Sequence, residues 1–542
     1  MLLSLLFQIL LPILLTLLCY GLYHAVQFVY AELTSPLHFI DGPKNASLLA
    51  GNFGEILANP RKTSEWRREF GRIFRFKGLF SVTELHVCDV KAIDHLVSHP
   101  AVYQRPPVIL ASTAKVVGHG ILSVTSDEHK RQRRILNPAF GVSQVRMLTE
   151  TFVEKSVQLR DIWDHQITPG ESAIIDVSLW LRKMTLDVIG SAGFNYEFNA
   201  LNEEGRTSEL NQVFTQLFHS PNSERYNAFR LAQARIPILR FFPVPGGRML
   251  RNARMKMQSI GRRIVAESLE ALRAAEGSKS LGAKRDLLSV LLRANVSPVV
   301  PESQRMTEEE AIAQIPSFFL AGQETTSSAV SWALHRLCLN PDVQAKLRDE
   351  LLTMSTDNPT MEELNSLPYL ESVVRETMRV HSPVPALQRM AMDDDVLPLA
   401  KPYIDKDGKE HYSLPIPQGQ TIHIPILAIN TDKEIWGDDA EEFRPDRWEK
   451  IPEAANSVPG VWAHLLTFFA GPHNCIGFRF SLVEIKALLF VLIRAFEFEP
   501  ALPQGDVIPS AVGITVSRPT IAGKGRASTL PMIVKRFEGV EC

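Results

Sequence analysis

The sequence contains little cysteine. Its 542 residues include five, none of them in a Cys-x-x-Cys pair, and they are spread over the chain as Cys19, Cys88, Cys338, Cys475 and Cys542. Disulfide frameworks and structural zinc sites both need cysteines in closely spaced sets. The pattern therefore argues against both, and it favours a reducing compartment.

An excess of either charge is also missing. The 58 basic and 60 acidic residues nearly cancel, so the sequence gives no sign of nucleic-acid binding, which needs a basic surface. We find no internal repeat. With 45% hydrophobic residues, the chain is long enough to bury one large core or two ordinary ones.

The beginning of the chain lacks charge. The stretch Leu2–Tyr23 contains one amide, Gln8, and no charged side chain, and the first charged residue is Glu32. About 20 apolar residues suffice to cross a bilayer as a helix. A cleaved signal peptide is the alternative, but no basic region precedes the run, the run is too long and no Ala-x-Ala site follows. We therefore predict a single transmembrane anchor over residues 1–30.

A segment with several prolines and glycines follows. Residues 31–56 cannot continue a long helix, so we expect a connector there and one large domain over residues 57–542. Within the connector, Asn45 begins a glycosylation sequon, which is inert if the domain faces the cytosol.

Most of the large domain shows apolar residues at helical spacing with charges between them. Helices are predicted over Val145–Ile167, Met249–Gly277 and Pro341–Met354, and short strands over Gly71–Gly78, Thr83–Val90 and Gln420–Ala428. The polar stretch Glu276–Asp286 is expected to be a surface loop. The predicted fold class is therefore mainly α with small β-sheets.

One cysteine stands in an unusual setting, the stretch "FFAGPHNCIG". The apolar run Ile476–Phe496 is predicted to be a buried helix, so Cys475 lies at a helix N-terminus, where free N–H groups favour a thiolate. Gly471 and Gly477 allow the backbone to approach something flat and bulky, and Phe468 is placed to pack against the loop. Three alternatives stay open at this point: a buried structural thiol, a catalytic nucleophile, or the iron ligand of a haem.

A second unusual stretch lies within the predicted helix Ser317–Leu337, where the letters AGQETT interrupt the apolar pattern. Small residues followed by an acid and a hydroxyl disfavour a helix, and the Thr325 hydroxyl can bond back to the Ala321 carbonyl. An ordinary helix with a tolerated glycine is one interpretation. The other is a helix that opens to admit a small ligand and a proton relay.

Two further patterns are weak when taken alone. Glu376 and Arg379 lie three residues apart on one face of a predicted helix, as many surface ion pairs do. Arg447 lies in a proline-braced loop with the sequence FRPDRW.

Taken in order, these stretches resemble the cytochrome P-450 family of haem-thiolate monooxygenases. The order is an acid–threonine helix, Glu-x-x-Arg, Phe-x-Pro-x-Arg-Trp and Phe-x-x-Gly-x-His-x-Cys-x-Gly. Ser126–Phe140 also resembles the family's haem-contacting helix, and Thr185–Phe198 resembles another of its segments. The resemblance covers essentially the whole chain after the anchor and implies the cytochrome P-450 fold.

The resemblance implies a role for each matching residue. Cys475 would be the proximal iron ligand of haem b, and Glu324 and Thr325 would help deliver protons to the oxygen site. Glu376, Arg379 and Arg447 would form a buried charged triad. The haem-binding residues would be His129 and Arg133 at the propionates, His473 as a further candidate, and Phe468, Gly471 and Gly477 in the cysteine loop.

The chain departs from the family pattern at three of these positions. Phe469 stands where a small or polar residue is more common. His473 replaces the usual arginine two residues before the cysteine, and His129 replaces a frequent tryptophan. These differences concern the propionate contacts more than the iron ligand.

The implied reaction inserts one atom of dioxygen into an organic substrate. Because the sequence shows no flavin or NADPH domain, electrons are expected from a membrane-bound NADPH–cytochrome P-450 reductase. Lys130, Arg131 and Arg134 are candidates for its docking face.

The likeness to fungal members implies a lipophilic substrate, such as a terpenoid or polyketide of secondary metabolism. It also implies an endoplasmic-reticulum membrane location, with the catalytic domain facing the cytosol. Apolar pocket walls are expected, with core packing as the alternative for each aromatic residue, from Tyr103–Gly118, Phe318, Phe319, His381–Leu387 and Ser510–Thr515.

Other functions remain to be weighed. One is a haem-thiolate isomerase or dehydratase that works without dioxygen, and another is a non-catalytic haem protein that binds a lipophilic ligand. Neither needs a proton relay, so the presence of Thr325 and Glu324 argues against both. A fatty-acid or xenobiotic hydroxylase is a third alternative.

Overall fold

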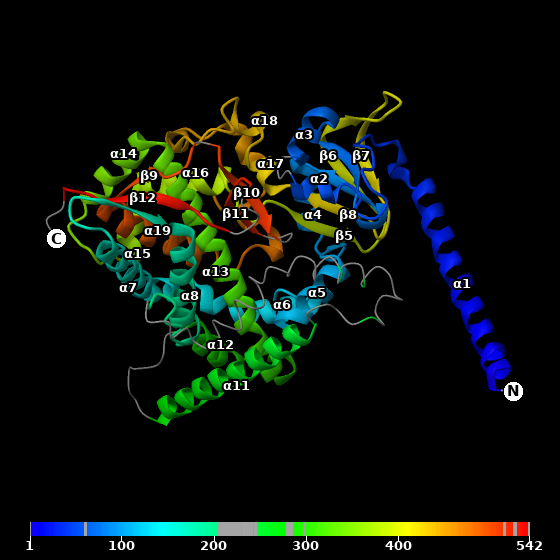
Figure 1. The fold of residues 1–542 in the computed structure, drawn as a ribbon, viewed down its shortest axis with the longest axis horizontal. Helices are drawn as coiled ribbons and strands as arrows, with labels where there is room; N and C mark the ends of the chain where they lie inside the picture. Colours follow the sequence, from blue (N-terminus) through cyan, green and yellow to red (C-terminus); the bar gives the residue numbers. More distant parts are fainter. Residues whose placement is uncertain are drawn as a thin grey trace. The chain divides into compact units, whose positions relative to one another are not determined.

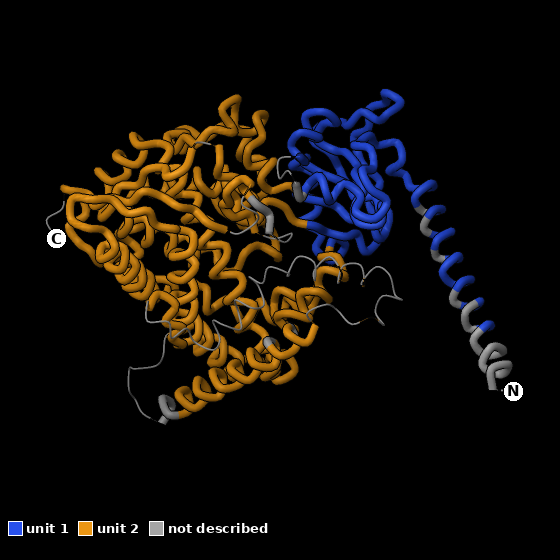
Figure 2. Tube along the Cα trace, viewed as in Figure 1, with its two compact units in different colours: residues 1–103, 388–424 blue, residues 104–387, 425–542 orange. Residues whose placement is uncertain are grey.

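The computed structural model describes residues 2–58, 62–202, 229, 233, 242, 247–277, 286–297, 299–503, 505–512, 516–523 and 528–539. The chain divides by its internal contacts into two compact units, which Figure 2 colours separately. Unit 1 consists of residues 1–103 and 388–424, and unit 2 of residues 104–387 and 425–542. The predicted boundaries at residues 30 and 56 stay predictions.

Unit 1 is built on a mixed β-sheet with short helices beside it (Figure 1). Its elements are α1 (Leu2–Thr34), α2 (Phe53–Ala58), α3 (Lys62–Phe70), β1 (Ile73–Lys77), β2 (Thr83–Val87), α4 (Val90–Ser98), β3 (Tyr103–Gln104), β5 (Leu387–Ala391), β6 (Asp395–Ile404), β7 (Glu410–Ile416) and β8 (Thr421–Ile424). The strand order is β1-β2-β8-β5-β3, with β1 antiparallel to β2 and β2 parallel to β8. Trp66, Phe74 and Phe76 pack together in its core.

The first helix of unit 1, α1, is continuous over 33 residues and contains Pro12. Among the residues that the structure describes, no helix combines the length and the apolar character that crossing a membrane requires. A helix is thus present where the anchor was predicted, over residues 1–30, but the membrane span itself is not confirmed.

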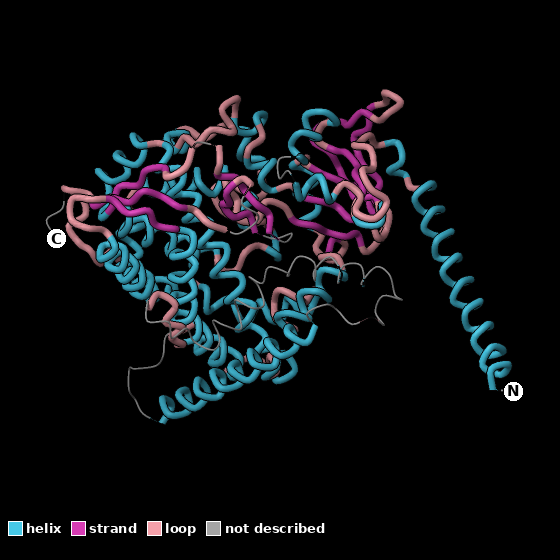
Figure 3. The backbone as a smooth tube through the Cα atoms, in the orientation of Figure 1, coloured by secondary structure: helices cyan, strands magenta, loops and turns pink. Residues whose placement is uncertain are grey.

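Unit 2 is mainly helical with two small antiparallel sheets, β4-β12-β9 and β10-β11, as Figure 3 shows by colour. The predicted fold class is therefore confirmed. Its elements are α5 (Pro107–Val117), α6 (Ser126–Leu136), α7 (Val142–Gln166), β4 (Ser172–Asp176), α8 (Val177–Phe194), α11 (Gly247–Gly277), α12 (Leu287–Val296), α13 (Glu308–Leu339), α14 (Pro341–Leu352), α15 (Met361–Asn365), α16 (Pro368–Val380), α17 (Ile426–Asn430), α18 (Lys433–Trp436), η6 (Pro445–Glu449), η8 (Leu466–Phe468), η9 (Gly471–His473), α19 (Phe478–Ala495), β9 (Phe496–Pro500), β10 (Val507–Val512), β11 (Val516–Ile521) and β12 (Pro531–Arg536).

Two helices dominate the core of unit 2. α13 begins with a capping box, in which the Thr307 hydroxyl accepts from the Glu310 N–H and the Glu310 carboxylate accepts from the Thr307 N–H. α13 contacts α8, α19 and β11, and most of its side chains are buried. α19 is buried along most of its length as well, because most of its residues after Phe480 are apolar. These two helices carry or flank most of the predicted site residues.

The predicted helices and strands lie within a few residues of α7, α11, α14, α19, β1 and β2. One prediction was wrong in detail. The strand predicted over Gln420–Ala428 ends at Ile424, because Pro425 has no N–H for a sheet and instead begins helix α17. The helix predicted over Ser317–Leu337 is present and lies within α13, which is continuous, so the backbone agrees with the ordinary-helix interpretation. Most of the predicted loop Glu276–Asp286 lies outside the described residues.

Candidate active site

The cysteine loop is closed by its own backbone. The Cys475 N–H donates to the Phe468 carbonyl at 2.9 Å, and the Asn474 N–H donates to the Gly471 carbonyl at 3.1 Å. Gly471 has φ +63°, a left-handed conformation that glycine adopts without strain. Phe469 has φ +58°, which is unusual for a phenylalanine, so the surrounding loop has to hold it in place.

The Cys475 thiol lies just ahead of α19. Burial raises its pKa, while a hydrogen bond from the Gly477 N–H and the charge of Arg133 lower it. The residue has a large accessible surface although burial is the main influence on its pKa. A sulfur that is accessible yet largely enclosed by protein atoms fits the wall of an internal site better than an outer surface.

The predicted propionate residues gather beside this loop. The Arg133 guanidinium donates to the Asn474 carbonyl at 2.6 Å and also bonds the Asn474 side chain. The rings of His129 and His473 lie 4.2 Å apart, centre to centre. α6 therefore places two of its side chains against the residues that immediately precede Cys475. Asn474 was not predicted, although it lies inside the cysteine motif, because its partner Arg133 is remote in sequence.

The acid–threonine step of α13 has an unusual exposure pattern. Ala321 is exposed and Thr325 is partly exposed, although the helix is buried around them. The Thr325 hydroxyl donates to the Ala321 carbonyl at 2.6 Å, as predicted. One short face of a buried helix is thus left open, and it carries a hydroxyl.

Glu324 faces a different direction, toward β11. Its carboxylate is 1% exposed and forms an ion pair with Arg518. Arg182 of α8 is a second cation nearby, and its pKa is lowered by burial and by Arg518 but raised by Glu324. Neither arginine was predicted, because each lies more than 100 residues from Glu324 in the sequence.

Further contacts on the same face of α13 hold β11. Ser328 and Trp332 follow Glu324 at intervals of four residues, and both donate to the Ser517 carbonyl, the indole at 3.3 Å. The Ser517 N–H in turn donates to the Pro383 carbonyl at 2.7 Å. Glu324 is therefore part of the interface that holds β11 against α13.

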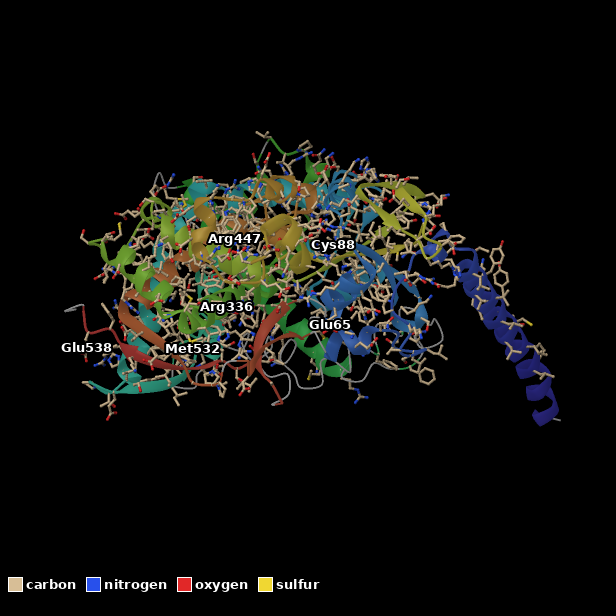
Figure 4. All side chains as sticks on the ribbon, turned by 90° about the horizontal axis from the view of Figure 1, so that it is seen from above. Glu65, Cys88, Arg336, Arg447, Met532 and Glu538 are labelled. Atoms are coloured by element: carbon tan, nitrogen blue, oxygen red, sulfur yellow. The ribbon has the colours of Figure 1, made fainter. Side chains whose placement is uncertain are left out.

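The three residues of the predicted charged triad meet in one buried network. The guanidinium of Arg379 donates to both oxygens of Glu376, at 2.7 and 2.9 Å. Arg447, which Figure 4 labels, approaches the same carboxylate at 3.4 Å. Glu376 and Arg379 are both fully buried. The spacing alone suggested a weak surface ion pair between Glu376 and Arg379, and that interpretation is wrong because both side chains are buried.

Other partners complete the network around Glu376. Its carboxylate accepts from the Trp448 indole at 3.1 Å and from the Arg444 N–H at 2.9 Å. The Arg447 guanidinium also donates to the Asp439 carboxylate at 2.7 Å. Burial lowers the pKa of Arg447, but Asp439 and Glu376 outweigh that effect and raise it overall. Asp439 and Trp448 were missed, although Trp448 belongs to the motif that pointed to Arg447.

Asn430 links this network to the cysteine loop. Its carbonyl accepts from Arg379 at 3.1 Å. Its side chain accepts from the Leu466 N–H at 3.0 Å and donates to the Thr467 hydroxyl at 2.8 Å. Phe468, the residue that closes the loop on Cys475, comes next in the chain. The triad therefore supports the loop through a short path of hydrogen bonds.

The residues predicted to form the pocket walls agree less well with the structure. Phe318 and Phe319 are buried in an aromatic cluster with Phe140, Phe194 and Phe198, with ring centres 4.7 to 6.2 Å apart. Core packing is the correct interpretation for both. The side chains of Ser510–Thr515 lie outside the described residues.

The comparisons with known proteins agree with this geometry. The chain matches the family model of cytochrome P450 over residues 42–521. Cytochrome P450 monooxygenase 205 of Postia placenta is 44% identical over 527 residues, which cover 96% of each chain. The chain belongs to the cytochrome P450 family.

Two more fungal relatives show the same likeness. Cytochrome P450 monooxygenase 128 of Postia placenta is 44% identical over 530 residues and 96% of each chain. Cytochrome P450 monooxygenase claQ of Ampulloclitocybe clavipes is 36% identical over 515 residues, 93% of this chain and 94% of the relative. This P450 is therefore a haem-dependent monooxygenase with a haem-thiolate cofactor.

The residues of this P450 fit such a cofactor. Cys475 supplies an accessible sulfur with a backbone N–H and a guanidinium beside it. The exposed face of α13 carries two small side chains, Ala321 and Thr325, which leave room for a flat group. His129 and His473 add polar rings next to the loop. The chemistry of these donors matches haem-thiolate ligation.

The buried triad of this P450 generates the first prediction. Replacing Glu376 by alanine leaves two buried guanidinium groups without their shared carboxylate, and we expect a loss of about 3–5 kcal/mol in the free energy of unfolding. The measurement is urea unfolding of the haem-loaded protein in detergent, with haem release recorded in parallel.

The matched control is Arg146→Ala, which breaks the exposed ion pair between Arg146 and Glu362 and should change stability little. Equal stability of the Glu376→Ala and Arg146→Ala proteins would contradict the role of the triad.

Proposed function

We propose that this P450 oxidises a lipophilic small molecule of fungal secondary metabolism, such as a terpenoid or polyketide, with electrons from NADPH. The observation that carries the oxygen-dependent reaction is the open face of α13, where the Thr325 hydroxyl lies next in sequence to the acid Glu324. An isomerase or dehydratase that does not use dioxygen needs neither group. The fungal origin of the relatives supports the substrate class.

The predicted cofactor is haem b, which when bound supplies dioxygen binding and oxygen transfer. In our proposal Cys475 holds the iron as a thiolate, which the Gly477 N–H and Arg133 stabilise. Arg133 also keeps Asn474 in place, so the loop stays closed while the sulfur is bound. His129 and His473 are proposed to contact the propionates.

Thr325 is proposed to hold a proton at its Oγ1 atom. Because this hydroxyl donates to the Ala321 carbonyl, its lone pairs are left to accept a hydrogen bond from a water on the open side of α13. The Glu324 carboxylate is paired with Arg518, so in our proposal it takes up or releases a proton only when that pair loosens. Arg518 thus controls the acid that we propose as the source of protons.

The redox partner is proposed to be an NADPH–cytochrome P-450 reductase. Of the predicted docking residues, Arg131 is held in an internal contact, since it bonds the Arg305 carbonyl at 2.7 Å and the Glu310 carboxylate at 3.1 Å. Lys130 and Arg134 are exposed on α6, and both remain candidates for the docking face.

The thiolate assignment gives the second prediction. Cys475→Ala should abolish the absorption band of the reduced, carbon monoxide-bound haem at its thiolate position, because no sulfur then reaches the iron. The matched control is Cys338→Ala, since Cys338 is buried in α13 and burial raises the pKa of its thiol to about 12. The proposal fails if the band survives in Cys475→Ala or disappears in the control.

The third prediction concerns proton delivery. Thr325→Ala should keep the thiolate band but convert less of the NADPH consumed into product, by about 10- to 100-fold at most. Thr149→Ala is the control, because Thr149 makes the same bond to a carbonyl four residues earlier, within α7. Product per NADPH is the quantity to measure, and an unchanged value in Thr325→Ala would count against the relay.

We also propose that the chain is anchored in the endoplasmic-reticulum membrane, with the catalytic domain facing the cytosol. The support is the uncharged sequence Leu2–Tyr23. The fourth prediction is that the double variant Leu15→Arg, Leu18→Arg leaves the membrane fraction under alkaline carbonate, since each central arginine costs about 2.5–3.5 kcal/mol of insertion.

The matched control for the anchor is Leu48→Arg, which places the same charge on an exposed connector residue and should remain in the membrane fraction. Release of the wild-type chain by carbonate would reject the anchor.

A further inference from the structure

Two buried glutamines lie between α6 and α13 and form no part of the site described so far. Gln132 of α6 and Gln314 of α13 are both fully buried. The Gln314 amide nitrogen donates to the side-chain oxygen of Gln132 at 3.1 Å and to the Glu310 carbonyl at 2.9 Å. A buried amide group is costly unless it is hydrogen-bonded, so each of its polar atoms needs a partner.

The two amides belong to one directional hydrogen-bond chain. At one end the Ile121 N–H, which can only donate, reaches the Gln314 side-chain oxygen at 3.1 Å. At the other end the Gln132 amide nitrogen donates to the Glu310 carboxylate at 3.3 Å and to the His119 carbonyl at 3.1 Å. Because one end must donate and the other must accept, each amide has one orientation that satisfies every bond.

Glu310, the last acceptor of this hydrogen-bond chain, is surrounded by donors. Its carboxylate pairs with Arg131 and accepts from the Thr307 N–H at 2.8 Å. Burial raises the pKa of Glu310, but Arg131 and the other donors outweigh that effect and lower it overall. An ionised carboxylate accepts hydrogen bonds and cannot donate them. The charge at the start of α13 therefore sets the direction of the whole hydrogen-bond chain.

The hydrogen-bond chain ends on a short turn, residues 118–123, which follows α5. The Ser123 hydroxyl closes this turn by donating to the carbonyls of Gly118 and Gly120, at 2.6 and 3.0 Å. Gly118 has φ +84°, a conformation that favours glycine. A Cβ atom on Gly120 would lie 2.6 Å from the Ala313 carbonyl oxygen, so the turn is too close to α13 for a side chain at this position.

The turn covers the part of α13 that comes just before its open face. A Cβ atom on Gly120 would also lie 2.7 Å from the Ser317 hydroxyl. Ala313 and Ser317 are buried. Ala321 and Thr325 follow at intervals of four residues, and they are exposed and partly exposed. Because residues four apart lie on nearly the same face of a helix, the turn borders the open face.

We propose that Gln314 and Gln132 are positioning residues that hold the turn 118–123 against α13, so that the turn forms a fixed edge of the open face and limits the size of ligand that fits there. Both act through the backbone of the turn, at the Ile121 N–H and the His119 carbonyl, and not by contact with the substrate or the haem. The effect on ligands rests on the proposed function, because it needs a haem at the open face, whereas the fixed turn does not.

Hydrogen exchange of the haem-loaded protein tests the fixed turn without turnover. Gln314→Met keeps the length of the side chain but removes its amide, so the Ile121 N–H should exchange about three- to tenfold faster, the effect of one hydrogen bond. The measurement is mass spectrometry with single-residue resolution. An unchanged exchange rate at Ile121 overturns the proposal.

The matched control is Gln344→Met. Gln344 of α14 is also a buried glutamine, and it donates to the carbonyls of Leu337 and Phe498 at 3.2 and 3.0 Å. Its replacement should lower stability by a similar amount and leave the exchange of the Ile121 N–H unchanged. Equally faster exchange at Ile121 in both variants would indicate a general loosening of the protein and would also overturn the proposal.

A double variant tests the hydrogen-bond chain itself. Gln132→Met removes a partner of Gln314, so the effects of the two single substitutions should not multiply. We expect Ile121 in the double variant Gln132→Met, Gln314→Met to exchange at the rate seen in Gln314→Met. A rate equal to the product of the two separate increases would show that the glutamines act independently, and it would reject the chain.

Gly120→Ala tests the contact with α13 without changing either glutamine. The added methyl group does not fit against the Ala313 carbonyl, so the turn has to move and the Ile121 N–H should exchange faster, as in Gln314→Met. This variant keeps the test decisive if Gln314→Met fails to fold. Exchange at the wild-type rate in Gly120→Ala would contradict the close contact.

The binding of two nitrogen ligands tests the edge of the open face. The probes are imidazole and 4-phenylimidazole, whose dissociation constants are read from the shift of the haem absorption band. Gln314→Met should bind 4-phenylimidazole about three- to tenfold more tightly relative to imidazole, because a loosened turn yields to the larger ligand. Gln344→Met should keep the wild-type ratio.

An unchanged ratio of the two dissociation constants in Gln314→Met would reject the limit on ligand size. The two proposals can fail separately. If Cys475→Ala leaves the thiolate band intact, the proposed function fails, but the exchange rate at Ile121 still decides whether the turn is fixed.

Discussion

The shared carboxylate of Glu376 is the constraint on which the catalytic half of the structure depends. Its two arginines bring together α16, α18 and η6, and Arg379 reaches the Asn430 carbonyl at the end of α17. Asn430 then fixes Leu466 and Thr467, directly before the cysteine loop. A buried ion network contributes less to net stability than its contacts suggest, because each charge has lost its water. The contribution of this network is geometric, because it fixes the relative positions of segments that lie far apart in the sequence.

Glu376, Glu324 and Glu484, three of the buried carboxyl groups that the structure describes in unit 2, lie in different electrostatic settings. Glu376 has two arginines and further donors, so it is neutralised by contact. Glu324 has Arg518, on a hairpin that α13 also holds through Ser328 and Trp332. Glu484 lies near the Thr326 hydroxyl, and burial raises the pKa of its carboxyl.

Sequence reasoning succeeded where a signal is local. Cys475 and Gly477 directly precede α19, whose beginning the apolar pattern predicted, and Thr325 lies inside α13, which the spacing also predicted. It failed where the partner is remote: Arg518 lies far from Glu324 in the sequence, and Asn474 lies far from Arg133, so both contacts come from the tertiary structure. The strand predicted over Gln420–Ala428 shows the remaining kind of error, because one proline outweighed a good apolar pattern.

Thr326 is buried, whereas its neighbour Thr325 is partly exposed. Adjacent residues of a helix point about 100° apart, so Thr325 and Thr326 face different surroundings. Thr325 lies on the open face with Ala321, whereas Thr326 lies against α19 and Glu484.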